Sequence, residues 1–220
     1  MRIIGGRLKG IRFNAPESLP VRPTTDMAKE ALFNILYNTY DFDNCDVLDL
    51  FCGTGNISFE FASRGIKSVT AVDKHSGCIY WVKSIIEKHQ LKEITVEKAD
   101  VFKYLAISKK SYQIIFADPP YDLPTIPKIP ELVMNNGFLS DNGILIVEHP
   151  SLLKLNAQPG FKETRRYGKP ARQVVRRWLK CYLITGRKQS GIVALLRKAR
   201  QCWLRAGVKM ICALCQSSSF

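Results

Sequence analysis

The stretch that decides the fold is Asp49-Leu50-Phe51-Cys52-Gly53-Thr54-Gly55, in which an apolar strand runs into a glycine turn and then a helix. Gly53 and Gly55 let the backbone approach a ligand where a Cβ atom would clash. A dinucleotide site prefers G-x-G-x-x-G, but Ser58 occupies the third glycine position here. Because Asp49 would repel a pyrophosphate and attract an ammonium group, the turn favours a nucleoside that carries an amino acid.

Downstream of this turn, strand and helix patterns alternate. We predict strands at residues 47–51, 69–72, 94–96, 112–117 and 144–148, and helices at 56–64, 75–89, 101–107 and the later part of 126–136. Residues 161–168 are a further candidate strand. Repeated units of this kind imply a parallel sheet with helices on both faces.

Two elements are predicted before the first strand. Residues 1–15 have the pattern of a β-hairpin around Gly5-Gly6 and Gly10. Between its apolar positions lie Arg2, Arg7, Lys9 and Arg12, which fit a solvated strand face and a phosphate-contacting arm equally well. Arg22-Pro23-Thr24-Thr25 is predicted to open a helix that continues to about Tyr40, because proline disfavours helix before it and threonine caps free N–H groups.

Two further acids follow predicted strands. Asp73 ends the second strand, where a carboxylate can accept hydrogen bonds from both hydroxyls of a ribose. Asp100 follows the third strand and can accept a hydrogen bond from an adenine amino group. As an alternative, Asp100 is an N-cap for the helix at 101–107.

The motif Asp118-Pro119-Pro120-Tyr121 comes directly after the fourth strand. Its two prolines fix φ and remove two N–H donors, which leaves rigid carbonyls and a carboxylate close together. Tyr121 offers a flat face on which a base can stack. Such a site suits a planar exocyclic amine whose N–H groups donate to Asp118 and to a proline carbonyl. A plain post-strand turn is the simpler alternative, but it does not account for the acids at the other strand ends.

Together these motifs resemble the RsmD family, which methylates the N2 amine of a guanine in bacterial 16S ribosomal RNA, at position 966 in the usual rRNA numbering. The segments that carry the resemblance are 2–10, 22–36, 49–55, 63–65 and 118–121, and it extends to about residue 168. The glycine turn and Asp-Pro-Pro-Tyr occur in many amino-methyltransferases, whereas the N-terminal segments are more specific.

The resemblance implies the α/β fold of class I S-adenosylmethionine-dependent methyltransferases, which is Rossmann-like, with a mostly parallel seven-stranded sheet. It implies that S-adenosyl-L-methionine is bound by Asp49, Phe51, Gly53, Gly55, Asp73 and Asp100, and is converted to S-adenosyl-L-homocysteine. The target guanine is expected to flip out of its stack into the pocket of Asp118, Pro119, Pro120 and Tyr121. RNA contacts are expected from Arg2, Arg7, Lys9, Arg12 and Arg22.

Composition sets the remaining expectations. No apolar run is long enough to span a membrane, the first residues lack a signal-peptide core, and the seven cysteines lack the spacing of a disulfide framework. We therefore expect a cytoplasmic monomer with reduced thiols and no metal site. Its partner would be 16S rRNA, in the small ribosomal subunit or an assembly intermediate.

The net charge of +14 is concentrated at one end of the chain. Residues 1–168 hold 21 Lys and Arg against all 19 Asp and Glu, whereas residues 169–220 hold 12 Lys and Arg and no acid. The sequence thus predicts three parts: an RNA-contacting hairpin at 1–22, a methyltransferase domain at 23–168 and a basic tail at 169–220. Because of this distribution, the global charge does not by itself argue for RNA binding by the main domain.

The basic tail has three interpretations. It can be an RNA-binding extension, an amphipathic basic helix around residues 192–205, or the product of a reading-frame change near codon 169. We favour the third, which predicts that the sheet lacks its last strand and exposes an unpaired edge.

Three other functions compete with the family's own. An adenine-N6 or cytosine-N4 methyltransferase would use Asp-Pro-Pro-Tyr equally well, because all these targets are exocyclic amines. A side-chain amide methyltransferase fits less well, since Asp118 stands where Asn is expected. The non-enzyme alternative is an RNA-binding module with a vestigial cofactor site, against which the intact turn at 49–55 argues.

Overall fold

The computed structural model of the 220-residue chain describes residues 1–19, 26–150, 153, 155, 161–167 and 179–185, the last two segments by their backbone alone. Arg22, the expected capping residues Thr24 and Thr25, and the predicted amphipathic stretch at 192–205 lie outside the described residues. All described residues belong to one compact unit, Met1–Lys188.

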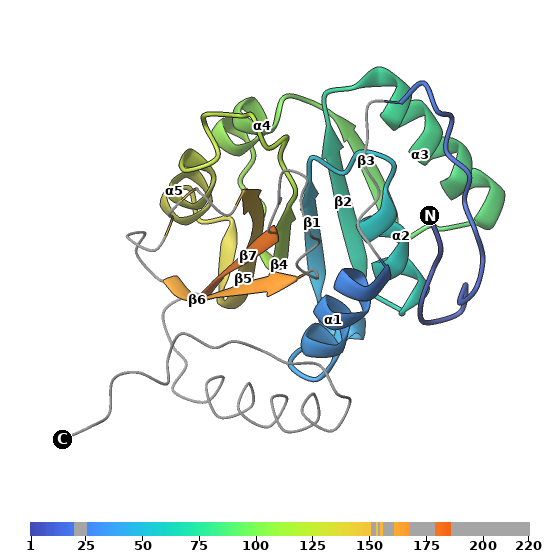
Figure 1. The fold of residues 1–220 in the computed structure, drawn as a ribbon, viewed down its shortest axis with the longest axis horizontal. Helices are drawn as coiled ribbons and strands as arrows, with labels where there is room; N and C mark the ends of the chain where they lie inside the picture. The colour runs from blue at the N-terminus through green and yellow to red at the C-terminus, as the bar shows by residue number, and fades with distance from the viewer. Residues whose placement is uncertain (20–25, 151–152, 154, 156–160, 168–178, 186–220) are drawn as a thin grey trace, which may run out of the picture. The chain divides into compact units, whose positions relative to one another are not determined.

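A seven-stranded sheet forms the centre of this unit (Figure 1), in the order β3-β2-β1-β4-β5-β7-β6. Its strands are β1 (Asp46–Leu50), β2 (Ser68–Asp73), β3 (Ile94–Lys98), β4 (Tyr112–Ala117), β5 (Leu139–Pro150), β6 (Phe161–Tyr167) and β7 (Leu179–Thr185). Strands β1 to β5 run parallel, and β7 runs antiparallel to both β5 and β6. The predicted α/β fold with a mostly parallel sheet is confirmed.

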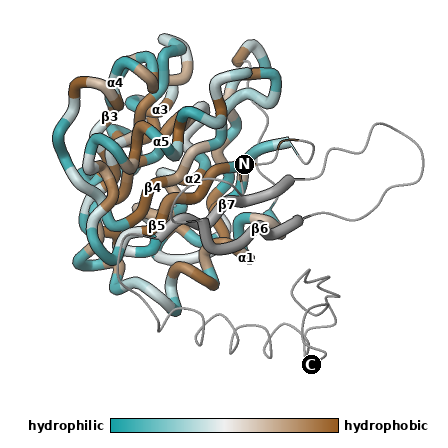
Figure 2. Tube along the Cα trace, turned by 90° about the vertical axis from the view of Figure 1, so that its left-hand side faces the viewer, coloured by the Kyte–Doolittle hydropathy of each residue, from teal (hydrophilic) through white to brown (hydrophobic). Residues whose placement is uncertain are grey.

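Helices cover both faces of the sheet. The helical elements are α1 (Asp26–Tyr37), the 3-10 turn η1 (Phe42–Asn44), α2 (Asn56–Ser63), α3 (Ser76–His89), α4 (Val101–Ile107) and α5 (Lys128–Asn135). Figure 1 shows α4 and α5 on one side of the sheet and α1, α2 and α3 on the other. The core accordingly has two hydrophobic clusters, one on each face. Figure 2 shows the apolar strands β4 and β5 inside this layer arrangement. Among the described residues, no helix is long and apolar enough to cross a membrane.

The alternating side chains of the parallel strands explain the two clusters. Val47, on β1, belongs to the cluster that α1, α2 and α3 cover, whereas its neighbour Leu48 belongs to the cluster that α4 and α5 cover. Successive residues of a strand point to opposite faces, so a strand that is buried on both faces is apolar throughout. This is why residues 144–147 form an unbroken apolar run.

The sheet does not lack its last strand. Strand β7 lies in the segment 169–220 and pairs in register with β5, from Ile144↔Thr185 to Pro150↔Leu179. The expectation of an unpaired edge at β5 is therefore wrong. The acid-free composition of the segment led to that error, but backbone pairing needs only N–H and C=O groups and a run of strand-forming residues such as 179–185.

The N-terminal arm, residues 1–13, forms much less strand than the predicted hairpin. Its one isolated bridge joins Arg2 and Arg12. The amide N–H of Ile3 donates to the carbonyl of Ile11, and the N–H of Phe13 donates to the carbonyl of Met1, at 2.9 Å each. Further along the arm, backbone N–H groups donate to α2: those of Ile4 and Gly5 to Glu60, and those of Arg7 and Leu8 to Ser63.

Candidate functional site

Three acids lie in one row along the carboxyl edge of the sheet, on β2, after β4 and on β5. The strand-end neighbours in register are Val72 of β2, Leu50 of β1, Ala117 of β4 and Val147 of β5. The next residues in the β2, β4 and β5 chains are Asp73, Asp118 and Glu148. In open parallel sheets, ligands bind outside this edge of the strands. The acids therefore mark the side of the sheet on which a ligand is expected.

Asp49 lies on β1, two residues before Phe51, which is level with this row. It is 1% exposed, and the hydroxyl of Ser58 donates to its Oδ2 at 2.5 Å. Burial raises the pKa of Asp49 to about 7, and the negative charges of Asp118 and Asp73 act in the same direction, against the Ser58 hydrogen bond. Ser58, which stands in place of the third glycine of a dinucleotide motif, thus positions the carboxyl group of Asp49.

The turn after β1 has the backbone of a ligand-binding loop. Phe51, Gly53 and Gly55 all have positive φ, at 60°, 53° and 76°. For Phe51 this conformation is strained, and such strain is found preferentially at functional sites. A Cβ on Gly55 would lie 2.9 Å from the ring of Phe59, so only glycine fits there.

Asp73 fixes this turn to the next strand. Its Oδ2 accepts the N–H of Gly53 at 2.9 Å, and its Oδ1 accepts the N–H of His75 at 2.8 Å. Each carboxylate oxygen has a second lone pair. The predicted ribose contact is therefore compatible with this structural role, which the sequence did not reveal.

Asp100 is the N-cap of α4. Its Oδ1 accepts hydrogen bonds from the N–H groups of Phe102 and Lys103, at 3.0 and 3.2 Å. The capping alternative is confirmed, and contact with an adenine stays a prediction.

The motif Asp118-Pro119-Pro120-Tyr121 follows β4 as predicted. The N–H of Asp118 donates to the carbonyl of Leu50 at 3.3 Å, which ties the motif to β1. Burial raises the pKa of the Asp118 carboxyl to about 6. The hydroxyl of Tyr121 donates to Oε1 of Glu148 over a long 3.4 Å.

Glu148 was missed as a site residue by the sequence prediction. It is 5% exposed, and burial raises its pKa to about 8, with the charge of Asp118 acting in the same direction. The signal was present, because Glu148 follows an apolar strand as Asp73 and Asp118 do.

The edge is acidic without a basic partner. In the part of the chain whose side chains are described, no Lys or Arg forms an ion pair with Asp49, Asp73, Asp118 or Glu148. The described residues hold no group of three or more side chains that suits a metal ion. A buried carboxylate without a counter-charge is costly, and for the buried Asp49 and Glu148 a cationic ligand relieves that cost. The donor set therefore fits the ammonium and sulfonium groups of S-adenosylmethionine.

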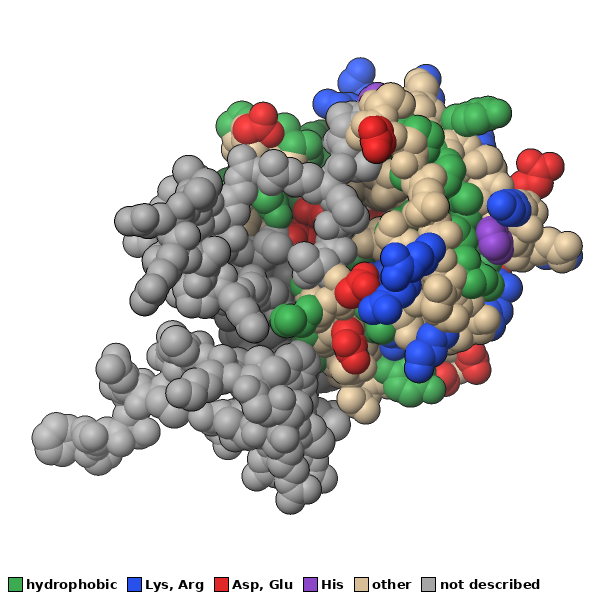
Figure 3. Space-filling model, turned by 45° about the vertical axis from the view of Figure 1, so that its right-hand side comes forward, with side chains coloured by type: hydrophobic (Ala, Val, Ile, Leu, Met, Phe, Trp, Pro, Cys, Tyr) green, Lys and Arg blue, Asp and Glu red, His purple; other side chains and the backbone are tan. Residues whose placement is uncertain are grey.

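The basic residues of the N-terminal arm fall into two kinds. Arg2 pairs with Asp26 at 3.0 Å, and Arg7 pairs with Glu93 at 2.5 Å. Lys9 and Arg12 are exposed. On the face drawn in Figure 3, Lys and Arg side chains stand in several separate places among acids, without one continuous basic patch. Contact of the arm with RNA therefore stays a prediction.

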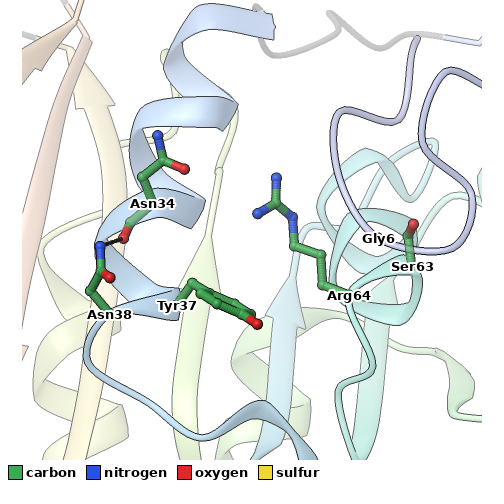
Figure 4. A pocket seen from close by; sticks show the side chains of 6 residues that line it. All are labelled: Gly6, Asn34, Tyr37, Asn38, Ser63 and Arg64. Atoms are coloured by element: carbon green, nitrogen blue, oxygen red, sulfur yellow. Dashed lines mark hydrogen bonds between the residues drawn. The ribbon is translucent and has the colours of Figure 1, made fainter.

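A cavity of about 440 Å³ lies away from this edge, between α1 and the end of α2 (Figure 4). Asn34, Tyr37 and Asn38 of α1 line it on one side, and Arg64 lines it on the other. Oε1 of Glu60 accepts the Nε–H of Arg64 at 2.8 Å, and the guanidinium lies 4.7 Å from the centre of the Phe33 ring. None of the predicted site residues lines this cavity.

Comparison with known proteins places this geometry in context. Residues 1–178 match the model of the family described as Conserved hypothetical protein 95. "Ribosomal RNA small subunit methyltransferase D" of Buchnera aphidicola is 30% identical over 153 residues, which are 70% of this chain and 78% of that protein. "Putative rRNA methyltransferase YlbH" of Bacillus subtilis is 33% identical over 159 residues, 70% of this chain and 85% of that one.

A solved structure shares the fold. The "Putative methyltransferase yhhF" of Escherichia coli superposes with a TM-score of 0.71 at 23% identity, over 86% of this chain and 99% of that one. The family match extends to residue 178, past the point near 168 where the sequence resemblance was seen to end.

Proposed function

Because the chain belongs to the family of Conserved hypothetical protein 95, we propose that it methylates the N2 amine of a guanine in 16S ribosomal RNA. The methyl donor is S-adenosylmethionine. Methylation of ribosomal RNA, without the base or the atom, is the activity that the names of the two relatives describe. The observation that carries the proposal is the acidic edge, whose acids form no ion pair with a described Lys or Arg, with Asp118-Pro119-Pro120-Tyr121 beside the glycine turn.

The first task of these residues is to hold the donor. We propose that Asp49 and the turn through Gly53 and Gly55 receive its amino-acid end, that Asp73 receives the ribose hydroxyls, and that Phe51 and Asp100 lie along its remaining length. When bound, S-adenosylmethionine supplies a methyl group that its sulfonium already activates. The protein then contributes mainly position and charge.

The second task is to present the amine. A base must leave its stack to reach the edge, which costs a few kcal/mol in a duplex and less in a loop. Tyr121 offers it a stacking surface, while Asp118 and a carbonyl of Pro119 or Pro120 accept its N–H groups. These acceptors orient the nitrogen and stabilise the positive charge that develops on it. No strong base is required, because the N2 proton becomes acidic as transfer begins, and we propose that the Asp118 carboxylate accepts it.

The test is identification of the methylated nucleoside. Small-subunit particles that lack the modification are incubated with the protein and S-adenosylmethionine, and their nucleosides are analysed by mass spectrometry. The proposal predicts N2-methylguanosine. N6-methyladenosine or N4-methylcytosine would point to the competing amine targets, and RNA binding without methyl transfer or cofactor binding would point to a vestigial site.

A matched pair of variants assigns the product to this site. Asp118→Ala is expected to abolish transfer and leave cofactor binding nearly intact. Asp122→Ala removes an exposed acid from the same loop and serves as its control. Loss of both transfer and cofactor binding in Asp118→Ala would show that its role is misplaced.

A further inference from the structure

Glu148 is a buried carboxyl group that the proposed reaction does not yet use. It lies next to Asp118 in the register of β4 and β5, since Ala117 and Val147 are paired immediately before them. It is 5% exposed, and no Lys or Arg whose side chain is described forms an ion pair with it. A buried acid of this kind needs either a proton or a ligand.

Two adjacent carboxyl groups in such a place share a proton, because like charges at short range do not both ionise readily. Burial raises the pKa of both carboxyl groups, and the charge of Asp118 raises that of Glu148 further. Glu148 is also the more deeply buried of the two, so we assign the shared proton to Glu148. The pair then presents one carboxylate, which only accepts hydrogen bonds, beside one carboxylic acid, which offers both a donor and an acceptor.

Tyr121 contacts the carboxyl group of Glu148. Its hydroxyl donates to Oε1 over 3.4 Å, so we assign the proton of the neutral acid to Oε2. Oε1 keeps a second lone pair for a ligand. Because Tyr121 belongs to the proposed base pocket, the donor and acceptor of Glu148 lie at the border of that pocket.

The Watson–Crick edge of guanine matches this arrangement. It presents, in order, the N2 amine, the N1–H donor and the O6 acceptor. We propose that Glu148 reads N1–H and O6 of the target guanine while Asp118 holds its N2 amine, and so selects guanine among the bases that carry an exocyclic amine. This inference rests on the proposed guanine-N2 activity and names the residue that determines its specificity.

The other bases fit the same pair less well. With the N6 amine of adenine at Asp118, the next groups are the N1 acceptor and a C–H, so Glu148 makes one hydrogen bond instead of two. With the N4 amine of cytosine there, the next groups are two acceptors, and one faces the carbonyl oxygen of Glu148. A buried polar group left without a partner weakens the interaction by roughly 10- to 100-fold, which is the source of the discrimination.

The experiment compares guanine with 2-aminopurine, which keeps the N2 amine but lacks N1–H and O6. Small-subunit particles are reconstituted with 16S rRNA that carries either base at the target position, and transfer to N2 is measured as kcat/KM. We expect the wild-type protein to prefer guanine by roughly 10- to 100-fold. Glu148→Gln should keep most of this preference, because an amide also offers one donor side and one acceptor. Glu148→Met, which fills the space without hydrogen bonds, should reduce the ratio to nearly 1.

A ratio that stays the same in Glu148→Met, or a wild-type ratio near 1, would overturn this inference and leave guanine-N2 transfer standing. Absence of N2-methylguanosine in guanine particles with the wild-type protein would instead overturn the proposed function. Even if Glu148→Met does not fold, a ratio near 1 between guanine and 2-aminopurine in the wild-type protein would overturn the inference. Circular dichroism and a urea unfolding curve show whether it does, and the preserved ratio in Glu148→Gln excludes a merely structural role.

Discussion

Buried carboxyl groups occur in two regions of this protein, and the two regions treat them in opposite ways. Glu60, on α2, is fully buried and forms ion pairs with Lys29 at 3.2 Å and with Arg64 at 2.8 Å. Its carboxylate also accepts hydrogen bonds from the N–H groups of Ile4 and Gly5. At the carboxyl edge of the sheet, the carboxyl groups of Asp49, Asp118 and Glu148 have no described basic partner, and their pKa values are raised.

The difference separates structure from function. Around Glu60, every charge is satisfied within the chain, and the network ties the N-terminal arm to α1 and α2. Lys29 also donates to the carbonyl of Arg2 and to Oδ1 of Asn56, the first residue after the glycine turn. At the sheet edge no described basic side chain fills this role, and we propose that a cationic methyl donor and the target amine do. Perturbed acids in such a place are typical of functional sites.

The largest effect should come from breaking the paired region. Lys29→Met leaves Glu60 buried with one cation fewer, which should lower the free energy of unfolding by about 3–5 kcal/mol. Urea unfolding measures this change. Lys67→Met is the control, because it breaks an exposed pair with Asp46 and should cost less than about 1 kcal/mol. Equal losses in the two variants would contradict the contrast between a buried network and a surface pair.

The second variant should lower activity and leave stability intact, which is the opposite of the effect of Lys29→Met on stability. Asp118→Asn removes a partly buried carboxyl group that has a raised pKa and no described basic partner, so we expect stability to hold or rise slightly. Transfer should fall by about 10²–10³-fold, because a group that stabilises charge in the transition state is lost. Unfolding curves and single-turnover rates are measured together. A variant that loses stability as Lys29→Met does would place Asp118 among the structural charges.

The third effect is the pH dependence of the ligand-free protein. The pKa values of Asp49, Asp118 and Glu148 are raised in the folded state to about 7, 6 and 8, so the folded protein binds protons more tightly than the unfolded chain. Stability contributed by these groups is therefore highest below about pH 4 and is lost as pH rises to about 8. Asp49→Asn should flatten the part of this decline below about pH 7. A wild-type stability curve that rises over this window with a slope unchanged in Asp49→Asn would contradict the assignment.

The smallest effect should come from the arm's surface pair. Arg2→Gln breaks an exposed contact with Asp26, so stability should change by less than about 0.5 kcal/mol. If Arg2 contacts phosphate, RNA affinity should fall and its salt dependence should become shallower by about one counterion. An unchanged salt slope, measured by filter binding, would make Arg2 a solvated strand residue.

Much of the fold was predictable because its signals are local. An apolar strand followed by glycine or an acid identifies β1, β2 and β4 from the sequence, and Tyr112–Ala117 was predicted to the residue. Strand β7 was not predicted, because its pairing with β5 is long-range and an unusual composition concealed it. The N-terminal arm forms only one bridge among the described residues because contacts with α2 determine its path. Gly6, for example, packs against the carbonyl of Ser63, where any Cβ would clash.

The site divides in the same way. Asp49, Asp73 and Asp118 were found because each lies in or directly after the last part of a predicted strand, and the structure places all three toward the carboxyl ends of neighbouring strands. The role of Glu148 depends on which strands are neighbours in the sheet, and sequence order does not state this. The role of Ser58 depends on how α2 packs back against β1. Asp100 shows the reverse limit, because its position predicted a helix cap and a ligand contact equally, and the structure confirms the cap.

The most direct test of the acidic edge as a cofactor site is the affinity for S-adenosylmethionine as a function of pH, measured by isothermal titration calorimetry. The ionised form of Asp49 attracts the cationic donor, and its pKa is about 7. We predict that affinity is highest above about pH 7 and falls by up to about tenfold per pH unit below it, with a much flatter profile in Asp49→Asn. Affinity that is independent of pH between 5 and 8, or equal profiles in the two proteins, would contradict the account.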